Sequence, residues 1–362
     1  MRLSFPYMGP TIVYKKLFEL LGHEVVMPPK PNKEIIDLGV KHSPEFACFP
    51  FKVITGIYLK LMEADKDLDA LVTSGGHGPC RAGYYGEVHK KVLEDLGHDV
   101  ELIVIDSPRD DYKYFYDTVK RLKGDSSWLQ VAQVIKTVYQ LTKALDEIEK
   151  KVEVLRAYND QGTINQIWMD AQKEFYQIKN TKEIKQLKNK YLNKLKKFED
   201  SIPAEKDRYK IGVIGEIYVV LEESINNQIE EKVNRFGFEV ERSQYLTDWI
   251  RENAFPFVGQ DLEEIEKKGE EFIEIEIGGH AQGNLGHAVD FKEKDFDGII
   301  HLKPFGCLPE LVSQSVIDDF SDKYEMPVLT ISIDEQTADA NVLTRVEAFL
   351  DMIREKDIRE VM

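Results

Sequence analysis

The chain has 362 residues, of which 42% are apolar and 31% charged, and its formal net charge at pH 7 is −17. This acidic balance argues against a nucleic-acid-binding surface, which needs a basic stripe to displace counterions. No apolar run reaches the roughly 20 residues that span a bilayer, and the first residues lack the features of a signal peptide. Three cysteines are too few for a disulfide framework, so we expect a cytoplasmic protein whose cysteines are free thiols or metal ligands.

The first part of the chain alternates short apolar runs with amphipathic segments. RLSFPYMG (residues 2–9) and HEVVMPP (residues 23–29) are typical of strands, and TIVYKKLFELLG (residues 11–22) is typical of a helix. A helix followed by a strand recurs at 88–106 and at 229–243. In all three copies a glycine separates the two, namely Gly22, Gly97 and Gly237. This order predicts parallel sheets with right-handed crossovers, and glycines in the left-handed conformation at the helix ends.

The character of the sequence changes near residue 110. Residues 111–200 contain two glycines and no proline, and their apolar residues recur at helical spacing. We therefore predict an N-terminal α/β domain over 1–110, a helical insertion over 111–206 and a C-terminal α/β domain over 207–362. The expected fold class is α/β, with two Rossmann-like (flavodoxin-like) parallel-sheet domains.

Two stretches far apart in the sequence repeat one pattern. Each stretch begins with Asp-X-Asp and an apolar run, and each continues into a Gly/Pro loop that holds a cysteine. The two stretches are DFDGIIHLKPFGCLPELV (residues 295–312) and DLDALVTSGGHGPCRAG (residues 67–83). These cysteines are Cys307 and Cys80. Because ligands gather at the carboxyl ends of parallel strands, both are expected where chemistry is usually placed.

The third cysteine, Cys48, lies between two prolines just before the expected helix FKVITGIYLKLMEA (residues 51–64). A helix N-terminus stabilises a thiolate. A lone cysteine is most often a small buried hydrophobe, but three such placements together indicate a shared metal site. Three sulfurs suit zinc with a further ligand, or an iron–sulfur cubane with one iron left open.

Several neighbours of the cysteines are candidates for contacts with a bound group. They can donate hydrogen bonds to its sulfurs, offset its charge or allow close backbone approach, and they are His77, Arg81, Gly76, Gly306 and Lys303. Glu216 ends the strand that opens the second domain. His280 lies in a glycine-rich stretch (residues 278–286) and His287 directly follows it, and both are expected in a loop before a helix. Acid–base roles are assigned as hypotheses to Glu216 and His280.

Several segments of the sequence resemble a known family. GIIHLKPFGCLPELVSQSV (residues 298–316), followed by PVLTISIDEQTADANVLTRVEAFLDMI (residues 327–353), is similar to the C-terminal half of the 2-hydroxyacyl-CoA dehydratase component D family. SGGHGPCRAGYYGEVH (residues 74–89) resembles the branch described as activase-related, near the double-cubane cluster proteins. The resemblance covers nearly the whole chain apart from the helical segment.

The resemblance implies an iron–sulfur cluster bound by Cys48, Cys80 and Cys307. The cluster would be a 4Fe-4S cubane, or an 8Fe-9S double cubane shared across a homodimer, in a protein that works anaerobically. An ATP-dependent activase or reductase would supply low-potential electrons, and the substrate would be an acyl-CoA or another small molecule. The activity would then be that of a dehydratase-like lyase or of a small-molecule reductase. The alternative is a non-catalytic scaffold that binds CoA or a partner and holds no cluster, or only a structural zinc.

Overall fold

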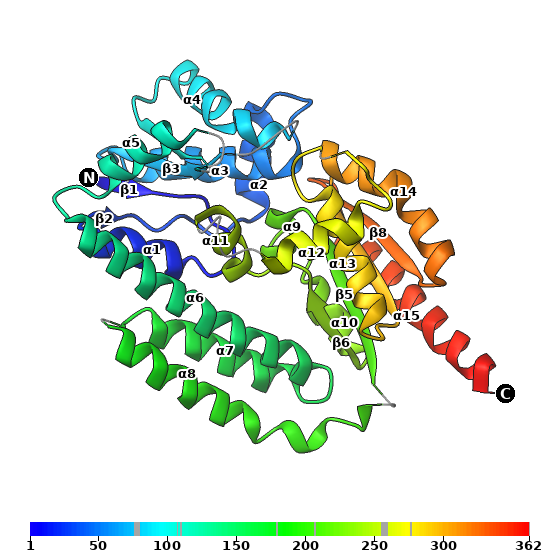
Figure 1. Ribbon diagram of the computed structural model, residues 1–362. Helices are drawn as coiled ribbons and strands as arrows, with labels where there is room; N and C mark the ends of the chain where they lie inside the picture. Colours follow the sequence, from blue (N-terminus) through cyan, green and yellow to red (C-terminus); the bar gives the residue numbers. More distant parts are fainter. Residues whose placement is uncertain are drawn as a thin grey trace.

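The computed structural model describes residues 1–75, 80–106, 108, 111–178, 180–205, 208–254, 260–275 and 277–361. Its architecture is α/β, with two four-stranded sheets that are parallel throughout (Figure 1). The strand orders are β2-β1-β3-β4 and β6-β5-β7-β8. Both sheets therefore have the order 2-1-3-4, which is the beginning of the flavodoxin-like order. The predicted fold class is confirmed.

The first sheet is built from the N-terminal part of the chain. Its strands are β1 (Arg2–Ser4), β2 (Glu24–Val25), β3 (Ala70–Ser74) and β4 (Glu101–Ile105). Its helices are α1 (Ile12–Leu20), α2 (Lys33–His42), α3 (Phe49–Ala64), the 3₁₀ turn η1 (Arg81–Tyr84), α4 (Tyr85–Asp95) and α5 (Tyr112–Leu122). Strands β1 and β2 are shorter than the sequence predicted. Prolines at 6, 28 and 29 supply no N–H for a ladder, so pairing stops before them.

The second sheet repeats this arrangement. Its strands are β5 (Tyr209–Gly215), β6 (Phe238–Arg242), β7 (Gly298–Pro304) and β8 (Val328–Ile333). Its helices are α9 (Ile217–Leu221), α10 (Ile229–Arg235), α11 (Leu246–Ala254), α12 (Gln260–Gly269), α13 (Ala281–Glu293), α14 (Leu308–Tyr324) and α15 (Asp339–Val361). The three predicted helix-ending glycines, Gly22, Gly97 and Gly237, have φ values of +88°, +81° and +76°, which confirms their left-handed conformation.

The second aspartate of the repeated Asp-X-Asp sequence has the same structural role in both sheets. Asp69 precedes β3, and its carboxylate accepts a hydrogen bond from the backbone N–H of Arg2 at 2.7 Å. Asp297 precedes β7, and its carboxylate accepts one from the backbone N–H of Lys210, also at 2.7 Å. Each aspartate thus joins the start of its strand to the start of the neighbouring strand. The two cysteine loops therefore follow equivalent strands of the two sheets.

Three long helices connect the two sheets in the sequence. They are α6 (Trp128–Arg156), α7 (Gln161–Phe175) and α8 (Thr181–Lys196), which lie side by side along one flank of the molecule (Figure 1). Their apolar sides form a buried core that includes Leu145, Phe175 and Tyr191. Helix α6 also contacts α1 and β6, so this layer packs against both sheet units. The division into domains at residues 110 and 206 stays a prediction.

Helix α3 lies between the two sheets and is almost fully buried. Its residues Val53 and Ile57 belong to one continuous core with Val213 of β5 and Ile300 of β7. Apolar residues on all sides of a helix are typical of a helix enclosed by protein. The same packing fixes the start of α3, where Cys48 lies, against the carboxyl ends of the second sheet.

The glycine-rich stretch 278–286 is a helix over most of its length, which corrects the prediction of a loop. Helix α13 begins at Ala281, so His280 immediately precedes it and His287 lies inside it. Its glycines serve helix packing: a Cβ atom on Gly286 would lie 1.8 Å from the carbonyl oxygen of Ile265 in α12. Helices α2 and α3 approach each other in the same way, through Gly39 and Gly56.

None of the helices in the described ranges combines the length and the apolar character needed to cross a membrane.

Candidate metal centre

Each of the three cysteines immediately precedes a helix. Cys48 is the N-cap residue of α3, Cys80 that of η1, and Cys307 that of α14. Pro50 and Pro309 lie in the first turns of α3 and α14, where the missing N–H costs no intrahelical bond. Helix N-termini carry partial positive charge, so the long helices α3 and α14 favour anionic sulfur at their starts.

The loops of Cys48 and Cys307 are in direct contact. The backbone N–H of Phe49 donates to the carbonyl oxygen of Phe305 at 3.1 Å. Gly306 has a φ of +77°, and a Cβ atom there would lie 3.3 Å from the Cα atom of Cys48. A side chain at this position would push the two loops apart, whereas the contact of Gly306 with a bound group stays a prediction.

The loops of Cys48 and Cys80 are joined by two further contacts. The exposed guanidinium of Arg81 donates to the carbonyl oxygen of Phe46 at 2.5 Å and lies 5.8 Å from the centre of the Phe46 ring. The phenol oxygen of Tyr85 lies 2.5 Å from the Sγ atom of Cys48. The three loops, which come from both sheets, therefore converge on one region.

All three thiols are shifted toward the neutral form. Burial raises the pKa of Cys48 to about 11, raises the pKa of Cys80, and raises the pKa of Cys307 furthest. The charges of the three groups also act on one another, since Cys80 raises the pKa of Cys48 and Cys48 raises that of Cys307. Backbone N–H groups act in the opposite direction, from Phe51, Ala82 and Glu310. The thiols would therefore lose their protons only when a cationic group binds to them.

The three cysteines can be compared with what a single ion and a cluster require of their ligands. Among the described residues, no three His, Cys, Asp or Glu side chains meet in a way that could hold one metal ion. Two thiolates on one zinc ion lie about 3.8 Å apart, given Zn–S bonds of about 2.3 Å in a tetrahedron. In a 4Fe-4S cubane each cysteine binds a different iron, so the sulfurs stand further apart. Three cysteines on separate loops could each bind a different iron of such a cluster.

Glu216 lies at the carboxyl end of β5 and reaches the same region. Its carboxylate accepts a hydrogen bond from the backbone N–H of Val219 at 3.1 Å, which caps α9. Burial raises the pKa of Glu216 to about 7. Its negative charge raises the pKa of all three thiols, so the carboxylate lies within electrostatic range of the cysteines. A carboxyl group with a pKa near neutrality can take up and release a proton at physiological pH.

His280 occupies the position before α13 that Cys48 occupies before α3. Each precedes the second helix of a pair that packs through glycine. Burial lowers the pKa of His280, and the carboxylate of Glu310 opposes this shift. The preceding residue, Gly279, borders the site, because a Cβ atom there would lie 3.8 Å from the Sγ atom of Cys80. His280 therefore belongs to the loop that faces Cys80.

A sequence model of the family described as 2-hydroxyglutaryl-CoA dehydratase, D-component, matches residues 11–353. The chain belongs to this family. The match includes all three cysteines, Glu216 and His280. The family is associated in general with iron–sulfur clusters and with an activase partner. No curated protein matches the chain.

Sequence reasoning missed Asn284 and Glu310, two members of a buried polar network behind Cys307. The carboxylate of Glu310 accepts from the side-chain amide of Asn284 at 2.9 Å and contacts the Nε2 atom of His301 at 2.7 Å. The Asn284 oxygen accepts from the backbone N–H of Gly215 at 3.1 Å. Asn284, His301 and Glu310 are all 0% exposed. The signal in the sequence was an acidic residue in the first turn after Pro309, where a carboxylate is favoured.

The remaining predicted neighbours have different surroundings. Lys303 is buried near the end of β7, paired in register with Ser332 of β8. Gly76 and His77 lie outside the described residues.

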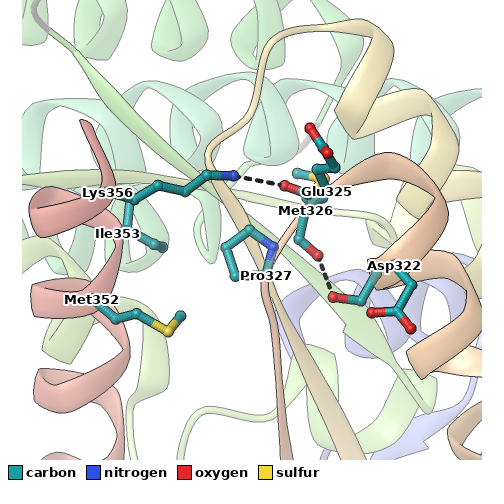
Figure 2. Close-up of a pocket in the computed structure, with 8 residues that line it drawn as sticks. Asp322, Glu325, Met326, Pro327, Met352, Ile353 and Lys356 are labelled. Atoms are coloured by element: carbon teal, nitrogen blue, oxygen red, sulfur yellow. Dashed lines mark hydrogen bonds between the residues drawn. The ribbon is translucent and has the colours of Figure 1, made fainter. Parts of the chain in front are cut away.

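A surface hollow of about 280 Å³ lies at the opposite end of α14 from Cys307 (Figure 2). It is lined by Ser321, Asp322, Glu325, Met326, Pro327, Met352, Ile353 and Lys356. Figure 2 shows Lys356 reaching toward Glu325, to whose carbonyl oxygen it donates at 3.0 Å. None of these residues belongs to a cysteine loop, so the hollow is separate from the candidate metal centre.

Proposed function

We propose that this chain is an iron–sulfur redox protein of the dehydratase family, in which Cys48, Cys80 and Cys307 hold a 4Fe-4S cluster. The observation that carries the proposal is the convergence of three cysteine loops, drawn from both sheets, at the starts of three helical segments. Family membership supports it independently, since the matched region contains all three cysteines.

The protein's own groups account for how such a cluster would be held. Buried thiols with raised pKa values keep their protons until a cationic group is present, so metal binding and deprotonation are coupled. A cluster bound through three cysteines supplies an iron with an open site for electron transfer or for binding a substrate oxygen. Glu216, whose charge acts on all three thiols, and His280, in the loop that faces Cys80, would exchange protons with a substrate there.

Two reactions fit this arrangement. One is radical elimination of water from a 2-hydroxyacyl-CoA, which the family's description favours. The other is reduction of a small molecule at an 8Fe-9S double cubane shared by a homodimer. In both, the electrons would come from a separate ATP-dependent activase, the partner associated in general with the family.

The surface around the cysteine loops supports a partner at this face. Large apolar side chains next to the cysteines are strongly exposed, with Phe46 at 73%, Tyr84 at 70% and Phe305 at 56%. Leu308 and Leu311 at the start of α14 are exposed as well. Exposed apolar groups gathered on one face mark an interaction site in soluble proteins. A second copy of the chain or an activase would cover them.

The competing function is a non-catalytic scaffold with a structural zinc or no metal. The test is the iron and acid-labile sulfide content of anaerobically purified protein, beside Cys48→Ala, Cys80→Ala and Cys307→Ala. The proposal expects about four irons per chain, as in a [4Fe–4S] cluster, and their loss in each variant. Leu308→Ala is the matched control, because it removes the side chain next to Cys307 but leaves the sulfur. Zinc or no metal in the wild type, even after reconstitution, would favour the scaffold.

A further inference from the structure

The contact between Tyr85 and Cys48 links a cysteine loop to a helix of the first sheet. Tyr85 is the first residue of α4, and its phenol oxygen lies 2.5 Å from the Sγ atom of Cys48. In the free protein either group can be the donor. A cysteine that binds iron is a thiolate and has no proton to give, so in that state only the phenol can donate.

The ring of Tyr85 is held in place by a group of aromatic side chains. Its centre lies 5.1 Å from that of Phe51 and 5.7 Å from that of His89, with nearly perpendicular ring planes in both cases. Phe51 and His89 stack on each other at 4.0 Å, and the Nε2 atom of His89 lies 3.2 Å from the carbonyl oxygen of Phe51. Since Phe51 is in the first turn of α3, this packing couples the position of Tyr85 to that of Cys48.

We propose that Tyr85 is a positioning residue that raises the reduction potential of a cluster bound at Cys48. The inference rests on the proposed function. A hydrogen bond to a ligand sulfur withdraws negative charge from it, which stabilises the reduced, more negative state of the cluster. Among the described residues, no other side chain is hydrogen-bonded to the sulfur of a cysteine, so Tyr85 makes Cys48 different from the other two ligands.

The test compares Tyr85→Phe with Tyr84→Phe. Phenylalanine at 85 keeps the ring packed against Phe51 and His89 and removes only the hydroxyl group. Tyr84 is the adjacent residue, is 70% exposed and loses the same hydroxyl in the control. All three proteins are loaded anaerobically, their iron and sulfide contents are measured, and their reduction potentials are determined by titration followed by electron paramagnetic resonance.

The expected result is equal iron content in the three proteins, with a more negative potential in Tyr85→Phe alone. A potential equal to that of the wild type in an iron-loaded Tyr85→Phe protein would overturn the role of Tyr85 and leave the proposed function intact. Absence of iron from the wild type would overturn both.

A second measurement uses the wild type alone and covers the case in which Tyr85→Phe does not retain iron. The iron–cysteine stretching bands are recorded by resonance Raman spectroscopy within minutes of transfer into D₂O. A phenol proton exchanges at once, but the first-turn amides that act on each of the three sulfurs lack intrahelical partners and can exchange as well. The shift assigned to Tyr85 is therefore the one that a single band shows in excess of the others. A prompt shift of one band is expected, and unchanged bands would overturn the proposal.

Discussion

Gly306 lies directly against Cys48, because a Cβ atom on Gly306 would be 3.3 Å from the Cα atom of Cys48 and 3.5 Å from the carbonyl oxygen of Ala47. Its φ of +77° also disfavours any side chain. Gly306→Ala is therefore expected to lower the free energy of unfolding by about 1–2 kcal/mol and to reduce iron retention. Urea denaturation and metal analysis measure the two effects.

The control for this substitution is Gly283→Ala. Gly283 lies in α13, and no atom is within 4 Å of its Cβ position. Alanine is a better helix former than glycine by roughly 0.5–1 kcal/mol, so this variant should be as stable as the wild type or slightly more so. A Gly306→Ala protein with unchanged stability and iron content would mean that the two loops are not in contact.

A buried ion pair joins α3 to the loop after β8. The Nζ atom of Lys52 lies 3.1 Å from a carboxylate oxygen of Glu335, and the Lys52 side chain is only 7% exposed. Lys52→Met should lower the free energy of unfolding by about 1–3 kcal/mol, since Glu335 would lose its charged partner in a poorly solvated site. Lys60→Met, two turns further along α3, removes more exposed pairs with Glu34 and Glu63 and should have a much smaller effect. Equal effects in chemical denaturation would contradict this prediction.

The aromatic group beneath Cys48 makes stability depend on pH. His89 is 1% exposed, and burial lowers its pKa from 6.5 to about 3. Between these values the unfolded chain binds a proton that the folded protein does not, so the free energy of unfolding falls as the pH is lowered. The expected slope from His89 is about 1.4 kcal/mol per pH unit. His89→Phe should reduce the loss of stability between pH 6.5 and 5, measured by urea denaturation, and parallel curves for the two proteins would refute the assignment.

The sequence predicted the two parallel sheets and the positions of the cysteines because both depend on local pattern. Apolar runs alternating with amphipathic helices predict crossovers, and a Gly/Pro loop after a strand predicts the carboxyl edge of a sheet. The equivalence of Asp69 and Asp297 could be noticed as a repeat, but its cause is a hydrogen bond to a strand that begins far away in the sequence.

The contacts around the cysteines could not be predicted in the same way. Tyr85 meets Cys48 across 37 residues, and Glu310 reaches Asn284 and His301 from another helix and a strand. Such pairs are set by how helices pack on sheets and leave no periodic signal in the chain. The glycine-rich start of α13 misled prediction for a related reason, because Gly286 serves close packing against α12 rather than a turn.

A second buried charge cluster joins the helical layer to the second sheet. Arg242 of β6 lies 2.7 Å from a carboxylate oxygen of Glu149, 3.0 Å from one of Glu153 and 3.3 Å from one of Glu230. Arg242→Met would leave Glu149 and Glu153 without their cation, whereas Glu230 keeps Arg156, and it should lower the free energy of unfolding by about 3–5 kcal/mol.

The pH dependence of the Arg242→Met protein follows from the same charges. Burial already raises the pKa of Glu149 to about 7, so its ionised form is disfavoured in the folded state, more so without Arg242. The destabilisation should grow as the pH rises from 5 to 8. Arg121→Met, which removes a surface pair with Glu101, is the control and should cost about 0.5 kcal/mol or less. A similar small effect at Arg242 would argue against the cluster.

The three thiols should differ in reactivity when no metal is bound. Burial raises the pKa of each, but Cys80 is partly exposed whereas Cys48 and Cys307 are 7% and 6% exposed. Only the thiolate reacts with iodoacetamide, so at pH 8 Cys80 should be alkylated first and Cys307 last. Mass spectrometry of peptides taken over time gives the order, and labelling in urea, where all three should react alike, is the control. Iron-loaded protein should be protected at all three positions. Rapid labelling of Cys307 in the folded, metal-free protein would show that its loop is open to solvent and does not form the buried site described above.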